Sequence, residues 1–336
     1  MHAPAAKQPA PAPDLGALQA LVAADLARVN HVILEQAHSD IALVSDVAAH
    51  IIAAGGKRLR PCLTIAAAKL CGYDGERHIR LAACVEFIHT ATLLHDDVVD
   101  ESALRRGNRT ANAVFGNQSS VLVGDFLFSR SFQLMVADGS LDVLKVLADA
   151  SAIISQGEVQ QLMLSRDLAI TRAQYEQVIA AKTAALFGAA CEIGAIITDQ
   201  QQLRAPLRAY GEALGMAFQL ADDALDYASN EAALGKTIGD DFREGKVTMP
   251  VMLAYQRGSA DERAFWEQAM ADEAEFTPAM LAEAKRMLHK HRTVDATLDH
   301  AGHYRDQALA ALAAFPASDA KAALEDAAAF AVRRSF

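Results

Sequence analysis

The chain has 336 residues, of which 52% are hydrophobic, 22% charged and only 6% aromatic. This composition is too apolar for a disordered chain, and the length allows a large buried core in one domain or two. The formal net charge of −11 argues against a nucleic-acid-binding role, which usually needs a basic surface. It does not exclude an anionic substrate, because metal ions or local basic residues can bind one.

The order of predicted elements points to one helical domain. Residues 1–15, with four of the nine prolines, are expected to be a flexible Ala/Pro-rich tail, and residues 16–336 a single all-α domain. Apolar periodicity predicts helices over about 18–34, 44–54, 61–70, 76–100, 119–136, 140–165, 171–197, 201–228, 246–257, 260–270, 278–291, 294–314 and 318–333. The polar, glycine-containing segments 105–117 and 235–245 are predicted loops. Sequence around 85–99 and 180–225 is apolar nearly all round, which predicts buried central helices.

The first chemical motif is Asp96-Asp97-Val98-Val99-Asp100, at the end of an apolar helix. Asp96 and Asp100 are four residues apart and share one helix face. Bare carboxylates here would repel one another, lose solvation and oppose the helix dipole, so a merely solvated helix end is the weaker alternative. Mg²⁺ removes these penalties and is often shared between a few carboxylates and substrate phosphates. The sequence therefore predicts a magnesium site.

The motif is repeated 126 residues further along the chain, at Asp222-Asp223-Ala224-Leu225-Asp226. One such motif is a modest signal, but two, each on an apolar helix, are much more specific. If the two helices face each other, their carboxylates form one rim where several Mg²⁺ ions hold a diphosphate. Asp240 and Asp241 either extend this rim or are ordinary loop charges.

Basic residues flank both acidic motifs. The turn Gly55-Gly56-Lys57-Arg58-Leu59-Arg60-Pro61 combines close backbone approach with charge-assisted hydrogen bonds to phosphate. Further cations are Arg105, Arg106, Lys182, Lys236 and Lys246. Each lysine alone is more often a solvated surface residue. As a set, the cations predict a second phosphate pocket that needs no metal.

His89 lies two helical turns before Asp96 on nearly the same face. It is either a core histidine or a substrate contact, and its place beside the carboxylates favours the contact. The chain has no nucleophile elbow, no Walker loop and no dinucleotide-binding glycine motif.

Several segments, in this order, resemble the trans-isoprenyl diphosphate synthase (polyprenyl synthetase) family, and most closely its octaprenyl diphosphate synthases. They are 57–61, 86–97, 105–107, 124–125, 182–183, 219–226 and 245–250. The resemblance covers nearly everything but the tail. It implies the isoprenoid synthase fold, in which central helices surround a deep apolar cavity. It also implies Mg²⁺, with three ions around a bound diphosphate, and a homodimer.

The resemblance assigns roles residue by residue. It implies magnesium ligands at Asp96, Asp97, Asp100, Asp222, Asp223 and Asp226. It implies contacts to the allylic diphosphate from Arg105, Lys182, Gln219, Lys236 and Lys246, with Thr183 near the reacting carbons. It implies contacts to the diphosphate of isopentenyl diphosphate from Lys57, Arg58, Arg60, His89 and Arg106. The residues expected to act in catalysis are Asp96, Asp97, Asp100, Arg105, Lys182, Asp222 and Lys236.

The implied reaction elongates an allylic diphosphate, such as farnesyl diphosphate, with successive isopentenyl diphosphate units. Metal ions and cations stabilise the leaving diphosphate as the allylic C–O bond ionises. The double bond of isopentenyl diphosphate attacks the cation, and the proton passes to the released diphosphate. This scheme fits the absence of an obvious protein base.

The length of the product is expected to depend on an apolar tunnel beside the first aspartate helix, as in the family. Ala91 and Thr92 are small and would leave this tunnel open, so the product is predicted to be octaprenyl or longer, for a quinone side chain. Phe132 and Met135, with Phe128, form the tunnel floor or belong to the ordinary core.

Three alternatives remain at this point. A terpene cyclase would not need the second cationic pocket, and a silent regulatory subunit usually loses aspartates or basic contacts. A plain magnesium-diphosphate-binding protein would have no use for long apolar helices.

The sequence contains no long, uncharged apolar run of the kind that predicts a transmembrane helix. At most transient contact with a membrane surface is therefore expected. The cysteines form no CxxC pair, and a cytoplasmic location is predicted.

Overall fold

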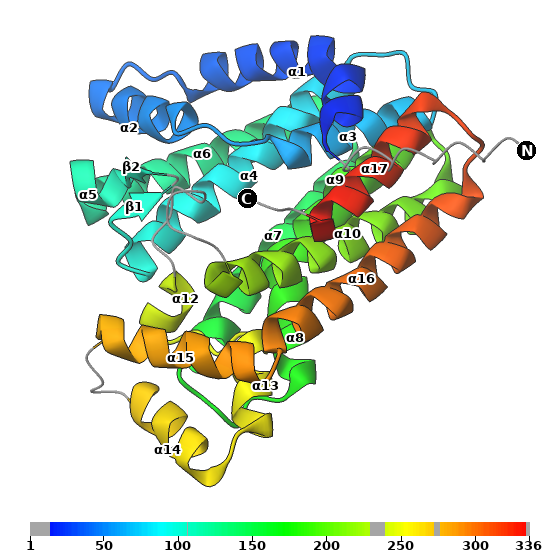
Figure 1. The fold of residues 1–336 in the computed structure, drawn as a ribbon. Coiled ribbons are helices and arrows are strands. Elements are labelled where there is room, and N and C mark those ends of the chain that lie inside the picture. The colour runs from blue at the N-terminus through cyan, green and yellow to red at the C-terminus, as the bar shows by residue number, and fades with distance from the viewer. Residues whose placement is uncertain (1–13, 106, 229–238, 272–275, 334–336) are drawn as a thin grey trace, which may run out of the picture.

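The computed structural model describes residues 14–105, 107–228, 239–271 and 276–333 (Figure 1). Two expected site residues, Arg106 and Lys236, lie outside these ranges, as does most of the expected tail. The first half contains α1 Gly16–Ala37, α2 Ala42–Ala53, α3 Leu59–Leu70, α4 Arg77–Val99, β1 Leu104–Arg105, β2 Asn108–Arg109, α5 Ala111–Phe115, α6 Asn117–Asp138 and α7 Leu141–Met163. The second half contains α8 Arg172–Ile179, the π-helix Ala180–Ala184, α9 Ala185–Ile197, α10 Gln201–Ala228, α12 Asp240–Arg243, α13 Met249–Arg257, α14 Ala260–Ala269, α15 Pro278–Lys290, α16 Thr293–Ala311, a 3₁₀ turn Leu312–Ala314 and α17 Asp319–Arg333.

Helices α4, α9 and α10 form the centre of the molecule, as their apolar sequences predict. Helix α10 packs along α9 and α16, while α4 packs along α6. Residues 186–197 of α9 are all buried. An added Cβ at Gly211 in α10 would lie 2.3 Å from the carbonyl oxygen of Phe187, so α9 and α10 touch backbone to backbone. The predicted all-α fold with buried central helices is confirmed.

Two segments differ from the sequence-based expectation. The predicted loop over 105–117 contains the antiparallel pair β1–β2 and the short helix α5. Gly107, at φ 77°, lies in the turn of this hairpin. The two strands are short and show no alternation of apolar and polar residues, so the sequence pattern did not predict them. The helix predicted over 171–197 is continuous, but its middle is the π-helix Ala180–Ala184. Hydrophobic periodicity does not show such a local change of pitch.

The expectation about membrane helices needs a qualification. Three segments, Gly16–Ala37, Asn117–Asp138 and Arg172–Ile197, are long and apolar enough to cross a membrane by length and composition. The third is largely buried within the bundle, whereas smaller shares of the first and second, 22% and 39%, are buried. All four cysteines are free and buried.

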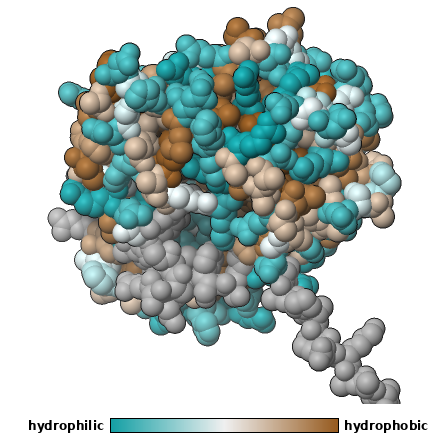
Figure 2. All heavy atoms as spheres, turned by 90° about the horizontal axis from the view of Figure 1, so that it is seen from above, coloured by the Kyte–Doolittle hydropathy of each residue, from teal (hydrophilic) through white to brown (hydrophobic). Residues whose placement is uncertain are grey.

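Seen from above, the molecule has a mostly hydrophilic surface interrupted by separate hydrophobic patches (Figure 2). Most exposed large apolar side chains in the described ranges lie on α6 and α7. They are Val121, Leu122, Phe132, Val136, Leu141, Val159, Leu162 and Met163.

Candidate active site

The C-terminal ends of α4 and α10 lie on either side of an acidic cavity of about 140 Å³. Asp100 lines it from the first motif, and Asp222 and Asp226 line it from the second. Asp240, Asp241, Glu244 and Lys246 close it from the segment that begins at α12. The structure therefore brings the two aspartate motifs together, as their sequences predict, and Asp240 and Asp241 extend the rim.

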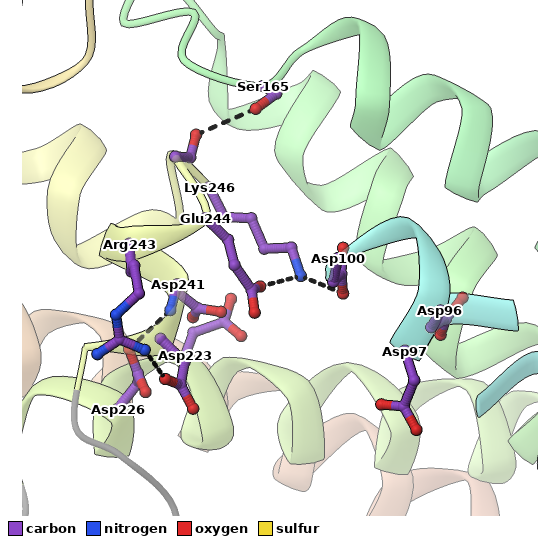
Figure 3. Close-up of polar contacts among 12 residues, drawn as sticks. Asp96, Asp97, Asp100, Ser165, Asp223, Asp226, Asp241, Arg243, Glu244 and Lys246 are labelled. Carbon is purple, nitrogen blue, oxygen red and sulfur yellow. Dashed lines mark hydrogen bonds and ion pairs between the residues drawn. The ribbon is translucent and has the colours of Figure 1, made fainter. Parts of the chain in front are cut away.

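Lys246 spans this cavity. Its Nζ lies 2.9 Å from Oδ2 of Asp100 and 2.5 Å from Oε2 of Glu244 (Figure 3). Burial opposes the charge on Lys246, but Glu244, Asp100 and Asp241 outweigh burial and raise its pKa. The pKa of the half-buried Asp241 is also raised, first by loss of solvation and then by Asp226 and Asp223. The site thus holds dense negative charge next to two cations, Lys246 and Arg105.

The aspartates of the first motif point in different directions. Asp97 is fully buried, and its Oδ1 accepts from Nε of Arg105 at 2.8 Å and lies 2.7 Å from Nη2. In Figure 3, the side chain of Asp97 extends away from that of Asp96. Asp97 is therefore placed to orient Arg105, while Asp100 faces the cavity.

The second motif shows the same division. Asp223 is 4% exposed, and both of its oxygens accept hydrogen bonds. The hydroxyl of Tyr175 donates to Oδ2 at 2.5 Å, and Nε2 of Gln219 donates to Oδ1 at 2.7 Å. Burial raises the pKa of Asp223 to about 6, although the hydrogen bonds from Tyr175 and Gln219 oppose this shift. By contrast, Asp222 and Asp226 line the cavity.

Lys182 connects the first motif to α7. Its Nζ lies 2.9 Å from Oε2 of Glu158 and 3.8 Å from Oδ2 of Asp96. Burial raises the pKa of Asp96 to about 6, while Lys182 opposes the shift. Sequence reasoning missed Glu158, although it is the one charged residue in the second half of α7, which was a usable signal.

The π-helix Ala180–Ala184 carries both Lys182 and Thr183 into the site region. Two glycines allow its close packing. A Cβ at Gly157 would lie 2.7 Å from Cβ of Ala181, and a Cβ at Gly215 would lie 2.6 Å from Cα of Ala184. The hydroxyl of Thr183 donates to Oε1 of Gln219 at 2.8 Å, which links the π-helix to α10. π-Helical turns frequently occur at functional sites.

The basic turn 55–61 lies near the C-terminal helix. Nζ of Lys57 lies 4.7 Å above the ring of Phe330 in α17, and the guanidinium of Arg60 lies 4.5 Å above Phe187. Arg58 instead forms an ion pair with Glu86, one helix away. This pairing favours a structural role for Arg58 over the predicted substrate contact. His89 is half-buried on α4, on the side of the helix that leads to Asp96.

The residues expected to set product length fall into two groups. Ala91 and Met135 are each 1% exposed and belong to the main core. Thr92 donates to the carbonyl oxygen of His89 at 2.8 Å. Phe132 is 38% exposed and contacts Phe128 edge to face, so it does not face the core. Within this chain, Met135 fits a tunnel floor better than Phe132.

The donor set fits magnesium, because carboxylate oxygens dominate and thiolates and imidazoles are absent from the cavity lining. Within the described ranges, no three carboxylate, imidazole or thiolate side chains are arranged to hold a metal ion by themselves. An ion at this rim therefore needs further oxygen ligands. Substrate phosphates and water supply such ligands.

Comparison with known proteins agrees with this site. The profile of the polyprenyl synthetase family matches residues 41–288. Octaprenyl diphosphate synthase of Escherichia coli (strain K12) is 43% identical over 322 residues, covering 96% of this chain and 99% of that protein. The chain therefore belongs to the polyprenyl synthetase family.

Two solved structures are also similar. A polyprenyl synthase from Caulobacter crescentus CB15, complexed with calcium and isoprenyl diphosphate, has a TM-score of 0.94 and 51% identity, covering 97% of this chain and 99% of that chain. A decaprenyl diphosphate synthase from Rhodobacter capsulatus has a TM-score of 0.89 and 49% identity, covering 95% of this chain and 98% of that chain.

Proposed function

We propose that this protein is a magnesium-dependent, long-chain trans-polyprenyl diphosphate synthase. It elongates an allylic diphosphate with successive isopentenyl diphosphate units, and the expected product is octaprenyl diphosphate for a quinone side chain. The observation that carries the proposal is the meeting of two aspartate motifs in one cavity, with a separate basic turn at 55–61. Family membership and the similarity to octaprenyl diphosphate synthase support it.

Asp96, Asp100, Asp222 and Asp226 are the residues best placed to hold magnesium, with three ions expected around a bound diphosphate. Bound Mg²⁺ would supply positive charge that stabilises a leaving diphosphate. Asp97 and Asp223 belong to the same motifs, but Oδ1 of Asp97 already binds Arg105, and the two oxygens of Asp223 accept from Tyr175 and Gln219. These two carboxylates therefore fit an orienting role better than direct coordination.

The cations of the chain divide between two diphosphates. Arg105, Lys182 and Lys246 lie beside the aspartates and are placed to bind the allylic diphosphate and its developing charge. Lys57 and Arg60 belong to the separate basic turn and, with His89, would bind isopentenyl diphosphate. Two pockets keep the two diphosphates apart while the reacting carbons are held close together.

In the proposed reaction, the allylic C–O bond breaks and its electron pair leaves with the diphosphate. The double bond of isopentenyl diphosphate then forms the new C–C bond, and the released diphosphate accepts the proton. No residue of the chain needs to act as a base. The role of the described side chains is to bind both substrates, to orient them and to stabilise charge.

The test is an assay of the pure protein with Mg²⁺, farnesyl diphosphate and radiolabelled isopentenyl diphosphate. Chain-extended product, with octaprenyl diphosphate as the main species by chromatography, is expected. Asp96→Asn is expected to abolish most turnover, while Asp306→Asn, on the surface of α16, serves as the matched control. A cyclised hydrocarbon, or no turnover by the wild type, would refute the proposal.

We also propose that the protein is a cytoplasmic homodimer that touches the membrane surface at most transiently. Support for the dimer comes from the exposed apolar side chains on α6 and α7, because apolar side chains that gather on a surface often mark a protein interface. No nucleic-acid partner is proposed.

A further inference from the structure

A chain of hydrogen bonds runs from α8 through the second aspartate motif to the π-helix. Tyr175 donates to Asp223 at 2.5 Å, and Gln219 donates to the other oxygen of Asp223 at 2.7 Å. The carbonyl oxygen of Gln219 accepts from Thr183 at 2.8 Å. Three helical segments are joined in this way, and none of the four side chains is exposed.

The direction of every hydrogen bond follows from Asp223. An ionised carboxylate can only accept, so both Tyr175 and the amide nitrogen of Gln219 must donate to it. The amide of Gln219 therefore turns its oxygen towards Thr183. That oxygen takes the only hydroxyl proton of Thr183, and the remaining lone pairs of the Thr183 oxygen stay available.

The four side chains share one cavity with Lys182. This cavity has a volume of about 100 Å³ and lies beside the acidic cavity, with Lys246 lining both. Tyr175 itself is 4% exposed, and its ring is held by the packing of α8 against the π-helix and α10. Its hydroxyl is therefore a fixed donor, and Tyr175 is not placed to contact metal because Asp223 lies between.

We propose that Tyr175 is a positioning residue of the synthase: through Asp223 and Gln219 it keeps the Thr183 oxygen as an acceptor that faces the cavity shared with Lys182. The inference rests on the proposed function. An oriented, electron-rich oxygen stabilises a carbon that gains positive charge as the allylic C–O bond breaks. Without the Tyr175 hydroxyl, Asp223 is a buried acceptor with one donor missing, and the amide and hydroxyl beyond it can reorient.

The test is a double-mutant cycle in the radiolabelled elongation assay. Tyr175→Phe is expected to lower kcat about ten-fold, the usual order for one lost hydrogen bond to a charged group. The KM for isopentenyl diphosphate and the Mg²⁺ concentration for half-maximal rate are expected to stay unchanged. In a Thr183→Val background, which has no hydroxyl to orient, Tyr175→Phe is expected to change kcat less than about two-fold.

The matched control is Tyr255→Phe, which removes a hydroxyl bonded to Glu267 at 2.9 Å, away from both cavities. An equal loss in both backgrounds, or a raised Mg²⁺ requirement, would overturn the proposed role, as would wild-type behaviour of Tyr175→Phe. If Thr183→Val turns over too slowly for kinetics, a crystal structure of Tyr175→Phe decides: an unchanged Gln219–Thr183 hydrogen bond contradicts the proposal. Failure of the wild type to elongate would instead refute the synthase function.

Discussion

Asp97 and Asp223 occupy the second position of their motifs, and both turn into the protein. One holds the guanidinium of Arg105, and the other holds the amide of Gln219. Asp100, Asp222 and Asp226 line the acidic cavity, while Asp96 lies beside Lys182. We therefore expect the second carboxylate of each motif to orient a neighbouring side chain rather than to bind metal.

The division predicts different consequences for two similar substitutions. Asp100→Asn is expected to raise the Mg²⁺ concentration for half-maximal rate by roughly ten-fold or more, because a charged oxygen ligand is lost. Asp97→Asn is expected to raise the KM for the allylic diphosphate, because Arg105 loses its anchor, while the Mg²⁺ requirement stays near wild type. Titrating Mg²⁺ against initial rate for both variants measures the difference. Equal Mg²⁺ curves for the two would contradict this division.

A second prediction at this scale concerns product length. Ala91 is fully buried on α4, and a larger side chain there has to occupy space inside the bundle. Ala91→Tyr is expected to shorten the main product because the phenol ring blocks the proposed tunnel. Chromatography of the dephosphorylated products gives the chain length, with Phe132→Tyr, at a partly exposed position, as the control. Unchanged product length in Ala91→Tyr would contradict the proposal that Ala91 lines the product tunnel.

The π-helix Ala180–Ala184 lies between two glycines, and this packing fixes where Lys182 and Thr183 enter the site. Gly157→Ala adds a Cβ at 2.7 Å from Ala181 and 3.1 Å from the backbone nitrogen of Lys182. Such contacts force the π-helix to move. Elongation activity is therefore expected to fall at least about ten-fold in a protein that is still folded, since small misplacements of catalytic groups are costly.

Gly302→Ala in α16 is the matched control, because an added Cβ there meets nothing nearer than 3.8 Å. That variant is expected to keep full activity and gain up to about 1 kcal/mol in unfolding free energy, from the better helix propensity of alanine. Circular dichroism and thermal unfolding separate loss of fold from loss of activity. Full activity in Gly157→Ala would show that the π-helix tolerates displacement.

Sequence reasoning predicted helix locations well and local detail poorly. Apolar periodicity placed α10 at Gln201–Ala228 and α7 within two residues of its ends, because both have long, regular buried faces. It could not place the π-helix or the β1–β2 hairpin, since neither changes the hydrophobic pattern. The spacing of the aspartates predicted a shared site, but the inward turn of Asp97 and Asp223 depends on partners distant in sequence, such as Tyr175.

At the scale of the whole molecule, the exposed apolar residues of α6 and α7 predict self-association. Light scattering after size exclusion is expected to give twice the chain mass. Replacing Leu122 and Val136, each 67% exposed on α6, with glutamate is expected to give monomers, because like charges would meet in a desolvated interface. The control is Ile41→Glu, at an exposed position between α1 and α2. A monomeric wild type, or dimers in the α6 variant, would contradict this interface.

Lys246 has a consequence for the order in which ligands enter. Its ammonium group is the counter-ion of Asp100 and Glu244 at the edge of the cavity. A free Mg²⁺ ion must displace that cation and gains little. A magnesium-diphosphate complex brings phosphate oxygens that pair with the displaced ammonium group while the metal ion pairs with the carboxylates. Every buried charge then has a partner of opposite sign. We therefore expect the cavity to bind the metal together with its diphosphate substrate, and chelators to leave thermal unfolding of the protein unchanged.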